Sequence, residues 1–321
     1  VFKAHNIGYF FYNGGNDSAD TAFKVSQISK KLNYPIKCIA IPKTVDNDLA
    51  LTDCCPGFGS AAKYIATSIL EASLDVESMF ETSTKVFILE VMGRHAGWMA
   101  ASSALAKTPK RDAPHIILLP EIIFNQKKFL LKVKDVIAKK GYCVIVASEG
   151  IKNSKGNFLS ESDTKDAFGH AQLGGVAPYL SSLVSKKLKL KNHWAVSDYL
   201  QRSARHIASN TDLLHAEAVG AHAIRYAISG MNGVMPIIVR GKGKKYTWKI
   251  EPAPLSKIAN LEKKLPKSFI TKDGLNVNKK AIDYLMPLIS GETFPDFQNG
   301  IPKIEELKLV KVKKRLSKWK P

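Results

Sequence analysis

One short segment of the chain combines the side chains that phosphoryl transfer requires. Residues 42–48 read Pro-Lys-Thr-Val-Asp-Asn-Asp and follow an apolar run. Asp46 and Asp48 supply a base and a carboxylate that could contact a metal ion. Lys43 and Thr44 add a cation and a hydroxyl, which suit deprotonation of a hydroxyl and neutralisation of a migrating phosphoryl group. The competing interpretation is an acidic loop closed by an Asx turn.

A pair of glycines in residues 13–18, Asn-Gly-Gly-Asn-Asp-Ser, offers a place for an anion. Gly14 and Gly15 let the backbone approach a ligand closely, and the start of the helix expected next favours negative charge. The same residues also fit a plain tight turn in which Asp17 or Ser18 caps that helix. The local pattern leaves both interpretations open.

Two further segments carry an arginine and a glutamate after apolar runs. Gly93 permits close backbone approach, and Arg94 beside it is a ready ligand for a phosphate or a hydroxyl. His95 invites acid/base or metal chemistry, although a structural hydrogen bond at a helix start is its more ordinary role. Glu149, within Ser-Glu-Gly, could accept hydrogen bonds from sugar hydroxyls.

These segments are expected at the carboxyl ends of strands, where open α/β sheets bind ligands. Strands are predicted at residues 7–12, 36–41, 85–91, 115–119, 142–148, 194–196 and 234–239. Helices are predicted at residues 17–32, 59–80, 95–106, 126–139, 173–190 and 212–229. This alternation predicts an α/β protein with mainly parallel strands, in one doubly wound sheet or two smaller ones. After Arg240 we expect an irregular extension, with a basic helix or tail over 304–319.

The composition is typical of a globular protein without a membrane span. Of 321 residues, 45% are hydrophobic and 24% are charged, and the longest apolar run is too short to cross a bilayer. The cysteines show neither metal-binding nor redox spacing, which favours reduced thiols and a cytoplasmic location; they are Cys38, Cys54, Cys55 and Cys143.

The charge balance is strongly basic. Lysine and arginine number 48 against 28 acidic residues, so the net charge is 48 − 28 = +20. A nucleic-acid-binding protein could carry such a charge, and so could an enzyme that holds anionic phosphates. No zinc-finger, RRM or basic-zipper pattern accompanies the charge, so we expect no nucleic-acid partner.

Taken in order, five motifs resemble the phosphofructokinase family. They are Gly-Gly-Asn-Asp-Ser, Pro-Lys-Thr-Val-Asp-Asn-Asp, Met-Gly-Arg, Ser-Glu-Gly and, at 199–202, Tyr-Leu-Gln-Arg. The resemblance implies two Rossmann-like α/β/α lobes in a homodimer or homotetramer. Residues 1–60 and 200–250 would form the donor-phosphate lobe. Residues 61–199 and 251–321 would form the fructose 6-phosphate lobe and a basic C-terminal extension.

One departure concerns the start of the chain. Family members carry a first strand and a Gly-Gly-x-x-Pro-Gly phosphate loop well before the Gly-Gly-Asn-Asp-Ser turn, and this sequence contains no such loop. We therefore expect the first lobe to be N-terminally truncated. The resemblance does not say whether such a chain is active or stable on its own.

The resemblance also implies roles for the matching residues. Asp46 would be the general base that takes the proton from the 1-hydroxyl of fructose 6-phosphate. The sugar site would comprise Thr44, Val45, Asp46, Met92, Gly93, Arg94, Glu149, Tyr199, Arg202 and Lys85, with a further contact from Lys191 or His193. Lys85 stands where the family places a cation for the 6-phosphate, which often reaches a neighbouring subunit. Mg²⁺ would be the cofactor, with Asn16 and Asp48 as its ligands, although ATP-type members have Asp in place of Asn16.

Two residues indicate the phosphoryl donor. ATP-dependent members have Gly where this chain has Asp17 and Lys43, whereas the pyrophosphate branch has Asp and Lys. A carboxylate at position 17 would repel the α-phosphate of ATP, and Lys43 would stabilise the compact charge of pyrophosphate. Residues 169–175, Gly-His-Ala-Gln-Leu-Gly-Gly, also resemble this branch.

We therefore expect reversible phosphoryl transfer from pyrophosphate to fructose 6-phosphate. The catalytic residues would be Asp46, Lys43 and Asp17, and the donor-phosphate site would comprise Gly14, Gly15, Asp17 and Lys43. An ATP-dependent kinase on the same fold and a non-catalytic regulatory subunit of the family are the alternatives.

Overall fold

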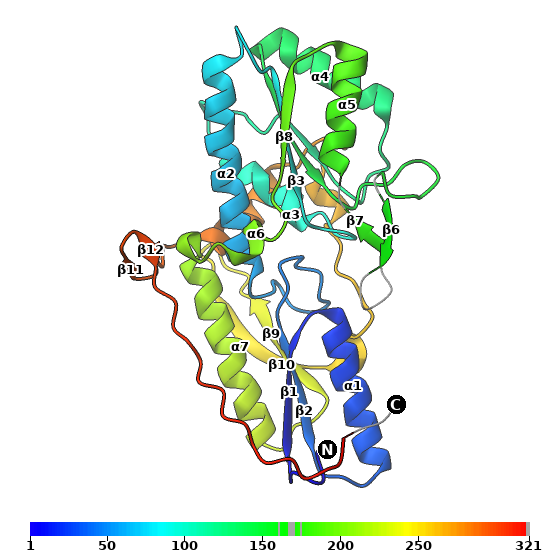
Figure 1. Cartoon of the computed structure of the whole chain (residues 1–321), viewed down its shortest axis with the longest axis vertical. Coiled ribbons are helices and arrows are strands. Elements are labelled where there is room, and N and C mark those ends of the chain that lie inside the picture. Colours follow the sequence, from blue (N-terminus) through cyan, green and yellow to red (C-terminus); the bar gives the residue numbers. More distant parts are fainter. Residues whose placement is uncertain (160, 166–170, 174, 319–321) are drawn as a thin grey trace.

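Two α/β lobes lie one above the other in the computed structural model of the chain (Figure 1). The structure describes residues 1–159, 161–165, 171–173 and 175–318. Each lobe is built on its own four-stranded sheet, so of the two arrangements compatible with the sequence, the chain adopts two smaller sheets. None of the helices in these ranges combines the length and the apolar character of a bilayer span.

The first lobe, in the lower half of Figure 1, holds a mixed sheet. Its strands in spatial order are β1 (Tyr9–Gly14), β2 (Lys37–Pro42), β9 (Val234–Arg240) and β10 (Trp248–Pro254). The first three are parallel, and β10 is antiparallel to β9. Helices α1 (Asn16–Lys31) and α7 (Asn210–Ile228) flank the sheet (Figure 1), and small buried side chains such as Ala19 and Ala223 let them pack closely.

The second lobe holds a parallel sheet that is buried on both faces. Its strands in spatial order are β4 (Ile116–Leu118), β5 (Cys143–Ser148), β3 (Val86–Val91) and β8 (Asn192–Val196). The core on one face includes residues of α2 (Phe58–Met79), α3 (Trp98–Ser102) and α8 (Lys279–Leu285). The core on the other face includes residues of α4 (Gln126–Lys140) and α5 (Val176–Leu188). Burial on both faces explains why β3 and β5 are nearly continuous apolar runs.

The remaining elements are short. They are α6 (Leu200–Ser203), β6 (Glu161–Lys165), β7 (Ala171–Leu173), β11 (Phe297–Gln298) and β12 (Ile301–Pro302). Single 3₁₀ turns are formed by Ser103–Ala106, Arg205–Ile207, Leu255–Lys257, Lys267–Phe269 and Met286–Ile289.

Three sequence expectations need correction. The helix expected over 95–106 is divided, because α3 begins only at Trp98 and continues as the 3₁₀ turn from Ser103. The helix expected over 173–190 begins at Val176, after Gly175 adopts a positive φ of 98°. The segment after Arg240 is not irregular throughout: β10 joins the first sheet, and α8 packs into the core of the second lobe.

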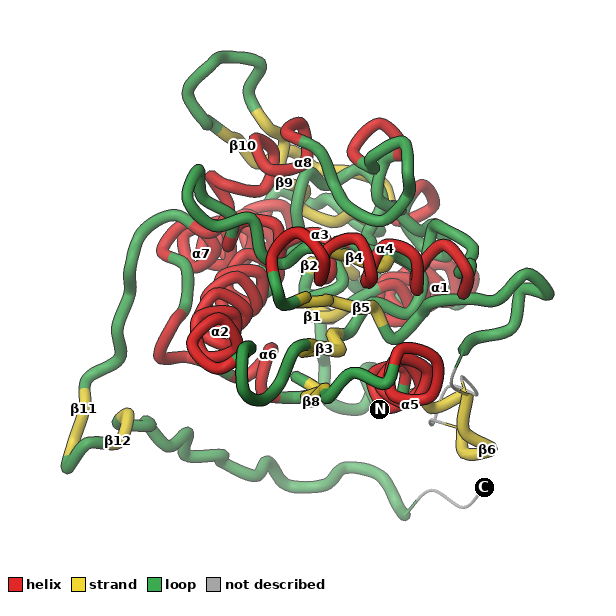
Figure 2. Tube along the Cα trace, turned by 90° about the horizontal axis from the view of Figure 1, so that it is seen from above, coloured by secondary structure: helices red, strands yellow, loops and turns green. Residues whose placement is uncertain are grey.

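The C-terminal residues form a tail rather than a helix. Residues 303–318 contain neither helix nor strand, and apolar side chains such as Leu307 and Leu309 are 88% and 89% exposed. Figure 2 shows the tail apart from the body of the molecule along most of its length. It reaches the first lobe near Arg315, whose Nη1 donates to the carbonyl of Ala4 at 3.2 Å.

Candidate active site

The glycine turn after β1 lies beside the loop after β2. Gly14 is paired with Pro42 at the end of the two strands, and the Lys43 N–H donates to the Gly14 carbonyl at 3.1 Å. A Cβ on Gly15 would lie 3.8 Å from the Cβ of Thr44. A Cβ on Gly14 would lie only 2.0 Å from the Ser18 hydroxyl, so any larger residue here would force the Ser18 side chain to move.

The loop after β2 presents its two carboxylates on either side of a left-handed residue. The Asp46 N–H donates to the Thr44 hydroxyl at 3.1 Å, which closes the first turn of the loop. Asn47 follows with a φ of 54° and is fully buried, a conformation that asparagine tolerates better than most residues. Asp46 and Asp48 are half-buried.

Arg94 comes close to Asp46 although the two follow different strands in different sheets. Burial raises the pKa of Asp46, and the positive charge of Arg94 opposes the rise most strongly. The Thr44 hydroxyl and the charges of His95 and Lys43 act in the same direction as Arg94. The carboxyl ends of β2 and β3 therefore meet where the two lobes join, a region here called the waist.

Glu149 adds a third carboxylate from the end of β5. The Gly93 N–H donates to Glu149 Oε1 at 3.2 Å, which ties the β3 and β5 loops together. Burial raises the pKa of Glu149 to about 7, the charges of Asp46 and Glu90 add to the rise, and Arg94 opposes it. Glu149 is thus a mixture of acid and carboxylate near neutral pH.

Asp48 and Asn16 provide oxygen atoms that suit a hard cation. Burial raises the pKa of Asp48 to about 6, with a further contribution from the charge of Asp46. Asn16 Oδ1 is buried and has no hydrogen-bond partner among the described residues. Mg²⁺ binds through one or two such oxygens together with substrate phosphates, so the two residues fit this ion.

The segment around α6 reaches the β3 loop through a glutamine. Gln201 is buried, and its Oε1 accepts from the Met92 N–H at 3.2 Å. On either side of it, Tyr199 and Arg202 are exposed, with the guanidinium 4.0 Å above the tyrosine ring. The contact of Gln201 with Met92 therefore brings the segment that carries these two residues to the β3 loop.

Lys85 is not brought to this site within one chain. It precedes β3, whereas Met92 follows the strand, and a strand of six residues spans roughly 20 Å. The Lys85 ammonium donates to the Phe80 carbonyl at 2.9 Å instead. Lys191 lies at the same far end, and its ammonium donates to the Ser83 hydroxyl at 2.9 Å. His193 is exposed on the edge strand β8.

The remaining predicted residues are partly accessible or not described. Asp17 is exposed in the first turn of α1, and Lys43 is exposed after β2. Val45 packs against the core of the second lobe. Of residues 169–175, only 171–173 and 175 are described, without the side chains of 171–173, so this segment lies mostly outside the described part.

Comparison with known proteins decides the family. The model of the family described as phosphofructokinase matches residues 1–227, well over half of the chain. The chain belongs to the phosphofructokinase family. The resemblance inferred from the five motifs is thereby confirmed.

The phosphofructokinase relatives include proteins of high identity. The chain is 55% identical to the pyrophosphate–fructose 6-phosphate 1-phosphotransferase of Halomonas elongata, covering 100% of the chain and 76% of that relative. It is 56% identical to the protein of the same name from Xanthomonas campestris, covering 99% and 77% respectively.

Solved phosphofructokinase structures confirm the fold. The pyrophosphate-dependent phosphofructokinase of Nitrosospira multiformis superimposes with a TM-score of 0.92 at 55% identity, covering 99% of this chain and 77% of that one. The phosphofructokinase of Pichia pastoris, at 20% identity and a TM-score of 0.61, shares the fold alone.

One part of this phosphofructokinase site gave no sequence signal. Residues 262–265, here named the bracing segment, contact the loops that follow β2, β3 and β4. The Lys263 N–H donates to the Asp48 carbonyl at 2.6 Å. The Glu262 carboxylate pairs with His95 Nδ1, and Leu265 N–H donates at 2.9 Å to Glu121 Oε1, which also accepts from Gly97 at 2.9 Å. The segment shows neither the apolar repeat of a helix nor that of a strand. Its sequence therefore did not indicate that it packs against these loops.

Proposed function

We propose that the chain transfers a phosphoryl group reversibly from pyrophosphate to the 1-hydroxyl of fructose 6-phosphate. The observation that carries this proposal is the convergence of Asp46, Arg94 and Glu149, from three different strand ends, at the waist between the lobes. Relatives that carry this activity in their names match the chain over its length at 53–56% identity.

Asp46 acts as the general base in this proposal. Burial raises its pKa and so strengthens it as a base, while the charges of Arg94 and Lys43 favour the carboxylate, the form that accepts a proton from the 1-hydroxyl. The protein otherwise contributes positioning and charge stabilisation, which dominate the catalysis of phosphoryl transfer.

The sugar lies against the loops of the second lobe. Glu149 accepts hydrogen bonds from sugar hydroxyls when it is ionised and donates one to them when it is protonated. Its pKa of about 7 makes both forms available. Thr44, Val45, Met92 and Gly93 line this region, and Tyr199 with Arg202 receives the 6-phosphate. A contact from Lys85 requires a second copy of the chain, in a homodimer or homotetramer.

The donor phosphates lie against the first lobe. The backbone of Gly14 and Gly15 and the Lys43 ammonium receive pyrophosphate, and Asp17 repels the α-phosphate of ATP. Asp48 and Asn16 would hold magnesium, which when bound neutralises charge on the migrating group. We further propose that residues 1–60 and 200–250 serve the donor, that 61–199 and 251–321 serve the sugar, and that the enzyme is cytoplasmic.

Replacing Asp46, the proposed general base, tests this function. The chain should form fructose 1,6-bisphosphate from fructose 6-phosphate, pyrophosphate and magnesium. Asp46→Ser should lower kcat by about 10²–10⁴-fold, because the hydroxyl loses its proton acceptor. Calorimetry should show that fructose 6-phosphate binding is largely retained. An unchanged kcat in the variant would remove the assigned base. Absence of turnover both in the parent chain and in a chain extended with the family's phosphate loop would favour the non-catalytic alternative.

A further inference from the structure

We propose that Lys263 is a positioning residue for the loop that carries Asp46 and Asp48. Its ammonium group holds two parts of this loop: Asn47, which lies between the two carboxylates, and the main chain at Thr52 and Asp53. The inference rests on the proposed function, because it assigns to Lys263 the alignment of the base and of the metal-binding carboxylate.

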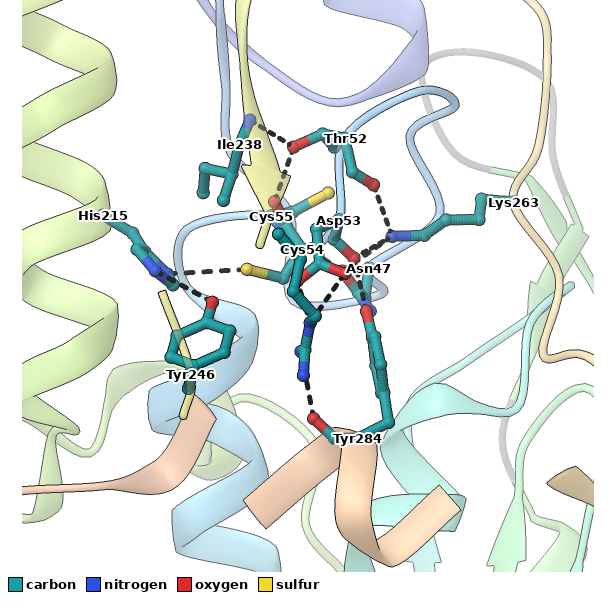
Figure 3. A network of polar contacts seen from close by, with 11 residues as sticks. Asn47, Thr52, Asp53, Cys54, Cys55, His215, Ile238, Tyr246, Lys263 and Tyr284 are labelled. Atoms are coloured by element: carbon teal, nitrogen blue, oxygen red, sulfur yellow. Dashed lines mark hydrogen bonds and ion pairs between the residues drawn. The ribbon is translucent and has the colours of Figure 1, made fainter. Parts of the chain in front are cut away.

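The ammonium of Lys263 uses all its donors on this loop. Nζ lies 3.2 Å from Asn47 Oδ1, 3.0 Å from the Thr52 carbonyl and 2.7 Å from the Asp53 carbonyl, as Figure 3 shows. An ammonium has three N–H donors, so three oxygen partners satisfy it completely. The main chain adds a fourth contact, since the Lys263 N–H donates to the Asp48 carbonyl at 2.6 Å.

Lys263 is itself held by the core of the second lobe. Its ammonium lies 5.2 Å from the centre of the Trp98 ring, and the Trp98 indole N–H donates to the Lys263 carbonyl at 2.9 Å. Trp98 is only 2% exposed and belongs to the core that contains α2 and α8. Lys263 therefore connects a rigid part of one lobe to the loop of the other lobe.

The groups that Lys263 contacts are also fixed from their other side. Asn47 Oδ1 accepts a second hydrogen bond from the Cys55 N–H at 2.9 Å. The Asp53 carboxylate accepts from Arg240 Nε at 3.1 and 3.0 Å, and the Asp53 carbonyl accepts from the Tyr284 hydroxyl (Figure 3). Removing the ammonium would take one hydrogen-bond donor away from each of three oxygens in this network.

The position of Asn47 makes this network relevant to the chemistry. Its left-handed backbone, with φ of 54°, sets the directions of Asp46 and Asp48 on either side. In-line phosphoryl transfer depends on such directions, and a displacement of about 1 Å can cost roughly 10²-fold in rate. A contact that holds the Asn47 side chain thus acts on catalysis without touching the substrate.

The test compares Lys263→Met with the matched control Lys264→Met in the full chain. Methionine retains most of the aliphatic stem and removes the three donors, whereas Lys264 is exposed. We expect Lys263→Met to lower kcat by about 10- to 100-fold while the KM values for fructose 6-phosphate and pyrophosphate change by less than about threefold. Hydrogen exchange in peptides covering residues 44–57 should accelerate only in Lys263→Met.

Chemical rescue separates positioning from a general loss of stability. Lys263→Cys treated with 2-bromoethylamine gains an ammonium at nearly the lysine position, and the four native cysteines are buried. Aminoethylation should restore kcat and slow the exchange of residues 44–57, and equally treated parent protein is the control. Lys263→Arg should remain impaired, because a planar guanidinium does not match three converging oxygens.

The outcomes distinguish this inference from the proposed function. If the parent chain turns over and Lys263→Met keeps its kcat and its exchange rates, Lys263 is not a positioning residue. If neither the parent chain nor a chain extended with the family's phosphate loop forms product, the proposed function fails, and the exchange of residues 44–57 alone decides the role of Lys263. If Lys263→Met does not fold, Lys263→Gln is measured by the same criteria.

Discussion

Three acidic side chains share a small space with Arg94 at the waist of the molecule. The charge of Asp46 raises the pKa of Glu149 and that of Asp48, in addition to the larger effect of burial. Such mutual repulsion is costly in the free protein and is relieved when cations or protons enter. The protonation state of the site therefore changes with pH in the neutral range.

Glu149 should therefore make the stability of the protein depend on pH. Burial raises its pKa from 4.5 to about 7, so the folded state binds a proton more tightly than the unfolded state. This contribution favours folding below pH 4.5 and is lost as pH rises toward 7. Glu149→Gln should gain stability over the parent chain at pH 8, by on the order of 3 kcal/mol at most, and less at pH 5.

Thermal unfolding at pH 5 and pH 8 measures this difference. Glu71→Gln on the exposed face of α2 is the matched control and should follow the parent chain at both values. A Glu149→Gln variant whose advantage is the same at both pH values would show that burial does not raise the pKa of Glu149.

At the scale of elements, the site depends on how closely the β3 and β5 loops approach each other. A Cβ on Gly150 would lie 1.9 Å from the Arg94 carbonyl oxygen and 2.7 Å from that of Gly93. Gly150→Ala should push the two loops apart and displace Arg94 from Asp46. We expect a loss of kcat of at least about 10²-fold together with lower stability.

Gly220→Ala is the matched control for this substitution. Gly220 lies within α7, and a Cβ there would meet no described atom within 4 Å. Alanine should raise the free energy of unfolding by about 0.5–1 kcal/mol through helix propensity and leave kcat unchanged. Urea denaturation and turnover measure both variants, and an active Gly150→Ala would refute the tight contact between the loops.

The sequence predicted the elements whose side chains repeat regularly. The strands up to residue 148 and the long helices α2, α4 and α7 follow the apolar patterns, and most catalytic candidates follow strand ends, as open α/β sheets require. β10, α8 and the bracing segment were missed because their residues are fixed by contacts with distant parts of the chain. Lys263 illustrates this, since the three oxygens that its ammonium contacts belong to residues more than 200 positions before it.

Lys85 shows what the order of residues along the chain leaves open, and its contact with the sugar phosphate stays a prediction. A residue before a strand and a residue after it are near neighbours in the sequence, yet the length of the strand separates them. The family resemblance supplied the role, and only the strand direction reveals that one chain alone does not bring Lys85 to Met92.

At the scale of the whole molecule, the carboxyl ends of strands from both sheets face a common waist. The first lobe brings the Gly14–Gly15 turn and the β2 loop, and the second lobe brings Arg94 and Glu149. A donor held by one lobe and an acceptor held by the other would meet in line at this place. The identity of the donor is therefore the central claim about the molecule.

Product formation with pyrophosphate and with ATP tests that claim most directly. The parent chain should form fructose 1,6-bisphosphate with a kcat/KM for pyrophosphate at least roughly 100-fold above that for ATP. The double variant Asp17→Gly, Lys43→Gly should lose this preference, because the repulsion of the α-phosphate and the cation for pyrophosphate are both removed. A parent chain that prefers ATP, or a double variant with an unchanged preference, would contradict the account.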